Sequence, residues 1–138
     1  MTLDAVKYNV IESVEDRAST IEFWDNDIIF IKLKDNIQVE LEDAQKQYVF
    51  LKAKYNNINK HIILVETDLD TSISKEAREF ASKPESNEMT AATAVIVKSL
   101  AHRIIINFII KLTHQQTMKM KMFDDKQKAI NWLLSFKK

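Results

Sequence analysis

Glycine is absent from this chain of 138 residues, cysteine is absent as well, and Pro84 is the single proline. Glycine is needed where the backbone takes a positive φ or comes close to a ligand. Phosphate-binding loops, the dinucleotide-binding turn and the nucleophile elbow of hydrolases all depend on it, so these sites are excluded. The lack of cysteine excludes disulfides, thiol nucleophiles and cysteine metal sites.

An excess of charge is also missing, because 20 lysines and arginines balance 20 aspartates and glutamates. A protein that binds nucleic acid normally carries a basic excess, so we expect no nucleic-acid partner. The longest apolar-rich stretch, residues 100–112, is too short for a membrane span and contains charged side chains. The N-terminal residues lack the basic and apolar regions of a signal peptide, so we expect a cytoplasmic protein.

The sequence offers few residues for catalysis or for metal binding. His61, His102 and His114 lie far apart, and none has the spacing of a metal site, so we expect them at the surface or at helix ends. No pair of nucleophile and base is readable, and only the fold could bring His102 close to Ser72. We therefore expect no enzyme, no metal and no cofactor.

Stretches of strand character alternate with stretches of helical period along the chain. The first two strands are expected to form a hairpin through residues 25–27, with Asn26 in the left-handed conformation. Later strands are short apolar runs, which are typical of a buried parallel sheet. The expected strands are 19–24, 28–34, 61–67, 91–97 and 118–123, with a further short strand within 8–13; the expected helices are 39–57, 74–83, 100–114 and 124–138; and residues 86–90 are expected as a loop.

The element order ββαβαβαβα predicts an α/β fold. We expect a mixed, mostly parallel sheet of four or five strands, with an N-terminal β-hairpin and flanking helices joined by right-handed crossovers. The length suits one domain over residues 1–138, in which residues 1–18 carry the weakest pattern.

Three segments, "SKEAREFAS", "AVIVKSLAHRIIINFIIKL" and "MKMFDDKQKAINWL", resemble a family of small bacterial STAS-like proteins. These proteins have the SpoIIAA-like fold of anti-sigma-factor antagonists and are sometimes grouped with CRAL-TRIO-type lipid carriers. The resemblance covers residues 19–136 and implies a binding or regulatory role without catalytic residues. In the antagonists a phosphorylatable serine begins the helix after the third strand, which makes Thr71, Ser72 and Ser74 the candidates here, although the glycine of that pattern is absent.

Residues 66–80, "ETDLDTSISKEAREF", gather acids and hydroxyls immediately before a helix. Helix capping and turn chemistry explain such a composition. Contact with a partner or phosphorylation is a second interpretation. Binding of a divalent cation by Glu66 and the two aspartates that follow is a third. The candidate residues of this loop are Asp68, Asp70, Thr71, Ser72 and Ser74.

The stretch 100–112 is more apolar than a helix on a sheet requires. At 100° per residue its polar side chains form one narrow stripe, whereas an apolar face of somewhat over 100° is enough to pack on a sheet. Three interpretations of the remaining apolar surface are open. It is covered by residues 1–18 or by the last helix, or it forms an interface with a partner. Alternatively, it lines a cavity for an apolar ligand together with Met118, Met120 and Met122. The candidate residues are Leu100, Ile104, Ile105, Phe108, Ile109 and Leu112.

These features predict a non-catalytic STAS-like regulatory or protein-interaction module. We expect it to associate through the helix at 100–112, with itself as a homodimer or with another protein. The loop around Ser72 is expected as a second contact. The alternative is a carrier or sensor of a small hydrophobic ligand such as a lipid.

Overall fold

The computed structural model describes residues 7–137 of the chain. Strands and helices alternate through most of this part, as the periodicity predicts. In chain order the elements are β1 (Val10–Glu15), β2 (Ser19–Trp24), β3 (Ile28–Leu33), β4 (Gln38–Val39), α1 (Leu41–Ala53), β5 (His61–Glu66), β6 (Ser72–Ile73), α2 (Lys75–Ser82), α3 (Pro84–Asn87), β7 (Thr90–Ile96), α4 (Leu100–Thr113), β8 (Lys119–Phe123) and α5 (Lys126–Leu134).

The main sheet is mixed and mostly parallel, which confirms the predicted fold class. Its strand order is β1-β2-β3-β5-β7-β8. β1 and β3 each pair antiparallel with β2, whereas β3, β5, β7 and β8 pair in parallel. The sheet has six strands instead of the four or five expected, because the weak pattern near the N-terminus forms β1 and pairs with β2.

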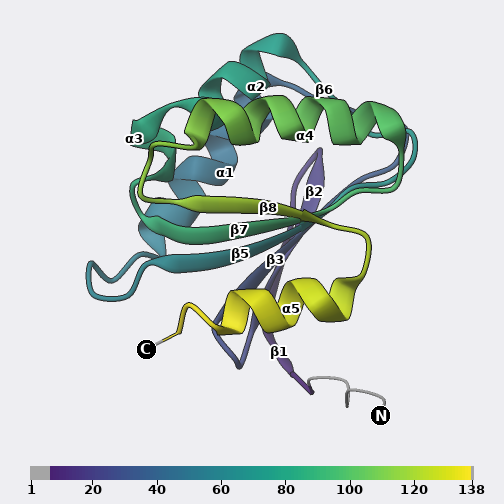
Figure 1. The fold of residues 1–138 in the computed structure, drawn as a ribbon. Helices are drawn as coiled ribbons and strands as arrows, with labels where there is room; N and C mark the ends of the chain where they lie inside the picture. The colour runs from purple at the N-terminus through teal and green to yellow at the C-terminus, as the bar shows by residue number, and fades with distance from the viewer. Residues whose placement is uncertain (1–6, 138) are drawn as a thin grey trace.

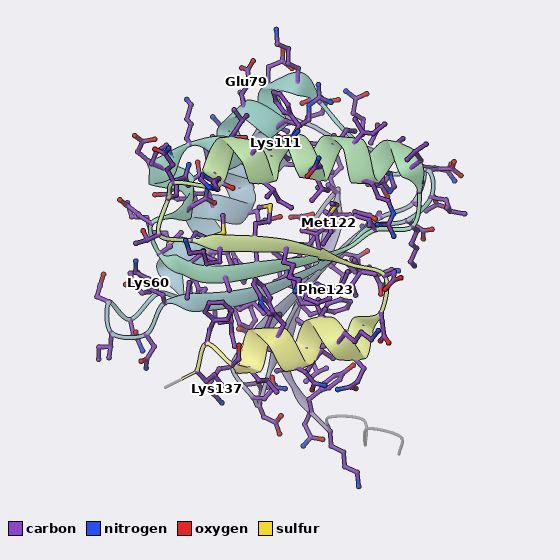
Figure 2. The ribbon with its side chains drawn as sticks, in the orientation of Figure 1. Lys60, Glu79, Lys111, Met122, Phe123 and Lys137 are labelled. Atoms are coloured by element: carbon purple, nitrogen blue, oxygen red, sulfur yellow. The ribbon has the colours of Figure 1, made fainter. Side chains whose placement is uncertain are left out.

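Helices cover both faces of the sheet, and Figure 1 shows α5 alone on one face and the other helices on the opposite face. Successive side chains of a strand point to opposite faces of the sheet, so each strand contributes to the core on both faces. In β5, Ile62 and Leu64 join the core beneath α5, whereas Ile63 joins the core beneath α1 and α2. In β8, Met122 lies on the α4 side and Phe123 on the α5 side (Figure 2).

Three short elements differ from the expectation. The two-residue strands β4 and β6 pair in parallel as a separate small sheet, with Gln38 opposite Ser72. Helix α3 occupies part of the expected loop and begins at Pro84, because proline suits the first helical position, where no N–H is needed. Strands of two residues carry no readable periodicity, so the sequence alone does not predict them.

Asparagine and aspartate take the positive φ angles that glycine would otherwise adopt. Among the described residues these are Asp27, Asn36 and Asn57, with φ of 74°, 54° and 63°. In the β2–β3 turn Asp27 adopts the left-handed conformation, so the expectation for Asn26 is wrong. The side-chain oxygen of Asn26 instead accepts a hydrogen bond from the Ile28 N–H at 3.2 Å.

The start of α1 is fixed by the buried carboxylate of Asp43. It accepts a hydrogen bond from the Glu40 N–H at 2.8 Å and one from the Arg17 Nε at 3.2 Å. The Arg17 guanidinium, followed by the backbone N–H, lowers the pKa of Asp43. This contact ties the β1–β2 turn to α1 at the helix end where a negative charge is favourable.

Candidate functional site

Helix α4 exposes an oblique row of four large apolar side chains, which we call the α4 stripe. Leu100, Ile104, Phe108 and Leu112 are 73%, 63%, 56% and 51% exposed. Residues four apart lie on one face of a helix, so the stripe extends for roughly 18 Å along α4.

The described part of the chain leaves the α4 stripe uncovered. The side of α4 that packs on the sheet carries His102, Ile106, Ile109 and Thr113, all of them buried. Helix α5 lies on the opposite face of the sheet, and β1 lies at the sheet edge farthest from β8 (Figure 1). Within residues 7–137, neither the N-terminal segment nor the last helix therefore shields the stripe. Residues 1–6, which are part of that first interpretation, lie outside the described residues.

Exposure of the α4 stripe has a measurable energetic cost. Full burial of one such side chain contributes about 1.5–3 kcal/mol. The exposed area of the four together corresponds to about two and a half fully exposed side chains. The protein therefore loses roughly 4–7 kcal/mol of the stabilisation that full burial of these side chains would give. This is a large fraction of the 5–15 kcal/mol by which a typical domain is stable.

Not every candidate on α4 belongs to this surface. Ile109 is 3% exposed and packs in the core with Val95 and Val97. Ile105 is half-buried beside the same core. The six candidates on the helix therefore divide into four on the outer surface and two on the inner side.

Helix α4 and the neighbouring helix α2 expose charges of opposite sign. Arg103 and Lys111 are exposed on α4, which contains no acidic residue. The neighbouring helix α2 exposes Glu76 and Glu79, and Figure 2 shows Glu79 on α2 and Lys111 on α4. One chain therefore presents an apolar row, a basic border and an acidic border on the same side.

Most hydroxyl groups in residues 67–74, which we call loop 67–74, are buried and hydrogen-bonded. Thr67 Oγ1 donates to the carbonyl of Ile96 at 3.1 Å. Thr71 Oγ1 donates to the carbonyl of Lys34 at 2.8 Å. Ser74 is the N-cap of α2, and its Oγ accepts from the Ala77 N–H at 3.1 Å. Capping and long-range hydrogen bonds thus account for three of the four hydroxyls.

The fourth hydroxyl belongs to Ser72, whose side chain is exposed. Its backbone N–H is bound to the carbonyl of Ile37 at 2.9 Å, so the chain around it is held in place. Asp70 is also exposed, Asp68 is half-buried, and Leu69 between them is 62% exposed. Of the five candidates in this loop, Ser72 and Asp70 are therefore the ones that lie at the surface.

His102 joins loop 67–74 to the start of α4. It lies in the first turn of α4, as expected for a helix-end position, but its side chain is only 7% exposed, so the expected surface position is wrong. Its Nε2 donates to the carbonyl of Thr71 at 2.6 Å, because a carbonyl oxygen only accepts, and its Nδ1 lies 3.3 Å from the Thr67 hydroxyl. His102 binds loop 67–74 at these two points, and no hydrogen bond joins it to Ser72 within the described residues.

The acidic groups of this region do not form a metal site in the described structure. Glu66 pairs with Lys32 at 2.6 Å, and the Asp68 side chain accepts from the Leu69 N–H at 2.8 Å. Among residues 7–137, no three side chains of histidine, aspartate and glutamate converge to hold a metal ion. Over the same residues, every helix is too short or too polar to cross a bilayer.

A cavity of about 180 Å³ lies between the sheet and the helices α1, α2 and α4. Ile106 and Ile109 of α4 line it together with Met120 of β8, while Tyr48 of α1 and Phe80 of α2 line it from the other helices. The rings of Tyr48 and Phe80 meet edge to face with their centroids 5.8 Å apart.

A second hollow, a cleft of about 650 Å³, lies on the amino-terminal side of β3 and β5. Lys54, Lys60 and Lys137 line it, and Figure 2 shows the last two. Lys54 pairs with Glu12 at 2.6 Å, and Lys137 pairs with Asp27 at 3.1 Å. Two of the three cations are thus neutralised. The sequence does not predict this cleft, because its lining comes from segments that are distant in sequence.

Comparison with known proteins supports the fold. Residues 22–137 match the family model described as "Domain of unknown function (DUF7793)". Among solved structures, the chain is similar to an uncharacterized protein of the DUF3478 family from Shewanella loihica PV-4, which is described as having a SpoIIAA-like fold. The identity is 14%, the TM-score is 0.58, and the match covers 96% of this chain and 99% of that chain. No match to a curated protein was found. The likeness confirms the SpoIIAA-like fold that the sequence predicts.

Proposed function

We propose that this chain, which belongs to the family described as a domain of unknown function (DUF7793), is a non-catalytic interaction module that forms a homodimer through the α4 stripe. The observation that carries the proposal is the exposure of four large apolar side chains along one helix. Contiguous apolar surface of this kind is typical of an interface.

A second copy of the chain suits this surface because the surface complements itself. A two-fold axis at α4 brings the stripe of one copy onto the stripe of the other, as in an isologous interface. With the axis directed along α4, we expect Glu76 and Glu79 of one copy to lie near Arg103 and Lys111 of the other. Such pairs at the border of an interface favour the correct partner and orientation.

The buried area limits what the stripe alone can contribute to association. Burial of both stripes contributes roughly 7–15 kcal/mol, which is close to the 4–15 kcal/mol that association costs. The four side chains expose roughly 400 Å², about half of what one partner contributes to an interface of standard size. Surface next to the stripe has to supply the other half, and we expect a dissociation constant of about micromolar size.

Loop 67–74 is the second contact in this proposal. Its exposed side chains are Leu69, Asp70 and Ser72, and His102 holds the loop against the start of α4. An interface centred on the stripe therefore reaches this loop at the N-terminal end of α4. A phosphate on the exposed Ser72 would add negative charge beside Asp70, which would change the contact.

The surroundings of His102 support the non-catalytic part of the proposal. Both ring nitrogens lie next to groups that hold the fold together, the Thr71 carbonyl and the Thr67 hydroxyl. The gap beside them measures about 10 Å³, which is room for at most one water molecule. A substrate has no space at this histidine.

Single-cysteine variants test the proposed contact directly, since the chain has no cysteine of its own. Ile104→Cys and Phe108→Cys lie within one helical turn of the centre of the stripe, so a two-fold dimer brings at least one of them close to its own copy. Val49→Cys, at a side chain that is 65% exposed on α1, is the matched control. Under mild oxidation we expect disulfide-linked dimers from an α4 variant well before they form from the control. Equal rates in all three variants would argue against the interface.

A second candidate function is that of a carrier or sensor of a small hydrophobic molecule, and the cavity of about 180 Å³ favours it. Pockets for drug-sized ligands measure about 300–1,000 Å³, so a long acyl chain exceeds this space. An apolar cavity of about 150 Å³ holds benzene. The size therefore favours a compact ligand over a lipid. Native mass spectrometry of the purified protein tests for a co-purifying molecule.

A further inference from the structure

We propose that the cavity between the sheet and α1, α2 and α4 binds a compact neutral molecule about the size of a substituted benzene. The ligand is mostly apolar and carries a hydrogen-bonding group that contacts the hydroxyl of Thr93. This inference rests on the second candidate function, ligand binding, and is independent of association through the α4 stripe.

Two buried hydroxyls in the lining indicate a polar group on the ligand. Thr90 and Thr93 are 5% and 8% exposed, and both line the cavity. The other buried threonines, Thr67, Thr71 and Thr113, each form hydrogen bonds to backbone carbonyls. A hydroxyl that lines a cavity can hydrogen-bond to a polar group of a molecule bound there.

The strand geometry places Thr93 on the floor of the cavity. Its neighbours Ala92 and Ala94 pack beneath α5, and alternation directs Thr93 to the opposite face of the sheet. In the sheet register Thr93 lies between Ile63 of β5 and Met120 of β8, and both of these side chains also line the cavity. A single hydroxyl is thus surrounded by apolar groups, which is the arrangement that orients a mostly apolar ligand.

The lining also limits the chemical class of the ligand. No charged side chain lines the cavity within the described residues, so an ionised ligand would lose its hydration without a counter-charge. A neutral phenol-like molecule satisfies both the volume and the hydroxyls.

Titration with phenol and with benzene, followed by the methyl NMR signals of Ile106, Ile109 and Val95, tests the proposal. We expect both probes to shift these signals and phenol to bind more tightly. Thr93→Val keeps the shape and removes the hydroxyl, so it should weaken phenol binding about fivefold and leave benzene binding within twofold. Phenol binding that is unchanged in Thr93→Val would overturn the role of this hydroxyl, while benzene binding would still support a ligand site.

A cavity-filling variant locates the binding independently of Thr93. Ala77 of α2 lines the cavity and is 2% exposed, so Ala77→Leu should fill part of the space and abolish binding of both probes. Ala53→Leu adds the same group at the exposed end of α1, outside this cavity, and should leave binding unchanged. If neither probe shifts the three methyl signals of the unmodified protein, the ligand site itself is refuted, whether or not Ala77→Leu folds. That outcome leaves the dimer proposal untouched.

Discussion

Two isoleucines on α4, only two positions apart, are predicted to lose very different amounts of stability on the same truncation. Ile106 is 5% exposed and lies between α4 and the sheet, whereas Ile104 is 63% exposed on the α4 stripe. Replacing each with alanine removes the same atoms from the same helix. The comparison therefore isolates the orientation of α4 on the sheet.

The expected magnitudes follow from burial. Ile106→Ala leaves a void in the core and should lower the free energy of unfolding by about 2–5 kcal/mol. Ile104→Ala removes a side chain that is only about one-third buried, so the loss should be roughly 0.5–1 kcal/mol. The higher helix propensity of alanine offsets part of that smaller loss.

Urea unfolding followed by far-UV circular dichroism measures the difference. The protein should be kept well below the expected dissociation constant, because association would add stability by mass action. With a slope of about 1–3 kcal/mol per molar urea, the Ile106→Ala midpoint should fall by about 1–3 M and the Ile104→Ala midpoint by much less. Equal losses, or a larger loss for Ile104→Ala, would show that α4 turns a different face to the sheet.

Two further predictions concern the contacts that position the helices. The pKa of Asp43 is lowered by Arg17 and by the Glu40 N–H, so its stabilising effect should be complete above its ordinary value near 3.9 and lost as the pH falls through the lowered value. Asp43→Asn should cost about 1–3 kcal/mol at pH 7 in thermal or urea unfolding, and the difference from the unmodified protein should shrink below about pH 4; a difference that does not vary with pH would contradict this. Ser74→Ala should cost about 1 kcal/mol by loss of the α2 cap, whereas the exposed Ser72→Ala should change stability by less than about 0.5 kcal/mol. A larger loss of stability for Ser72→Ala than for Ser74→Ala would show that Ser74 is not the cap of α2.

Much of the fold can be predicted from the sequence because its elements have strong periodicity. The longer strands and helices fall close to the predicted ranges, and their alternation indicates a mostly parallel sheet. The edge strand β1 is harder to predict, because Val10 and Ile11 are exposed and a half-solvated edge needs no regular apolar pattern. The two-residue strands β4 and β6 depend on pairing between distant segments, which no local pattern reveals.

The candidate site can be predicted only in part, for a related reason. The sequence alone shows that α4 has more apolar residues than a helix packed on a sheet needs, because they cover more than one face of the helix. Which of them face outward depends on how the helix is rotated, so Ile105 and Ile109 cannot be separated from Ile104 and Phe108 by sequence alone. The roles of the loop hydroxyls depend on distant partners, such as the carbonyl of Ile96 for Thr67.

The mass of the protein in solution as a function of concentration tests the central claim most directly. Sedimentation equilibrium over roughly 1–100 µM spans the expected dissociation constant. We predict that the average mass of the unmodified chain rises toward twice the monomer value, while the double variant Ile104→Glu/Phe108→Glu remains a monomer. A monomeric mass for the unmodified chain over the whole range would contradict association through the α4 stripe.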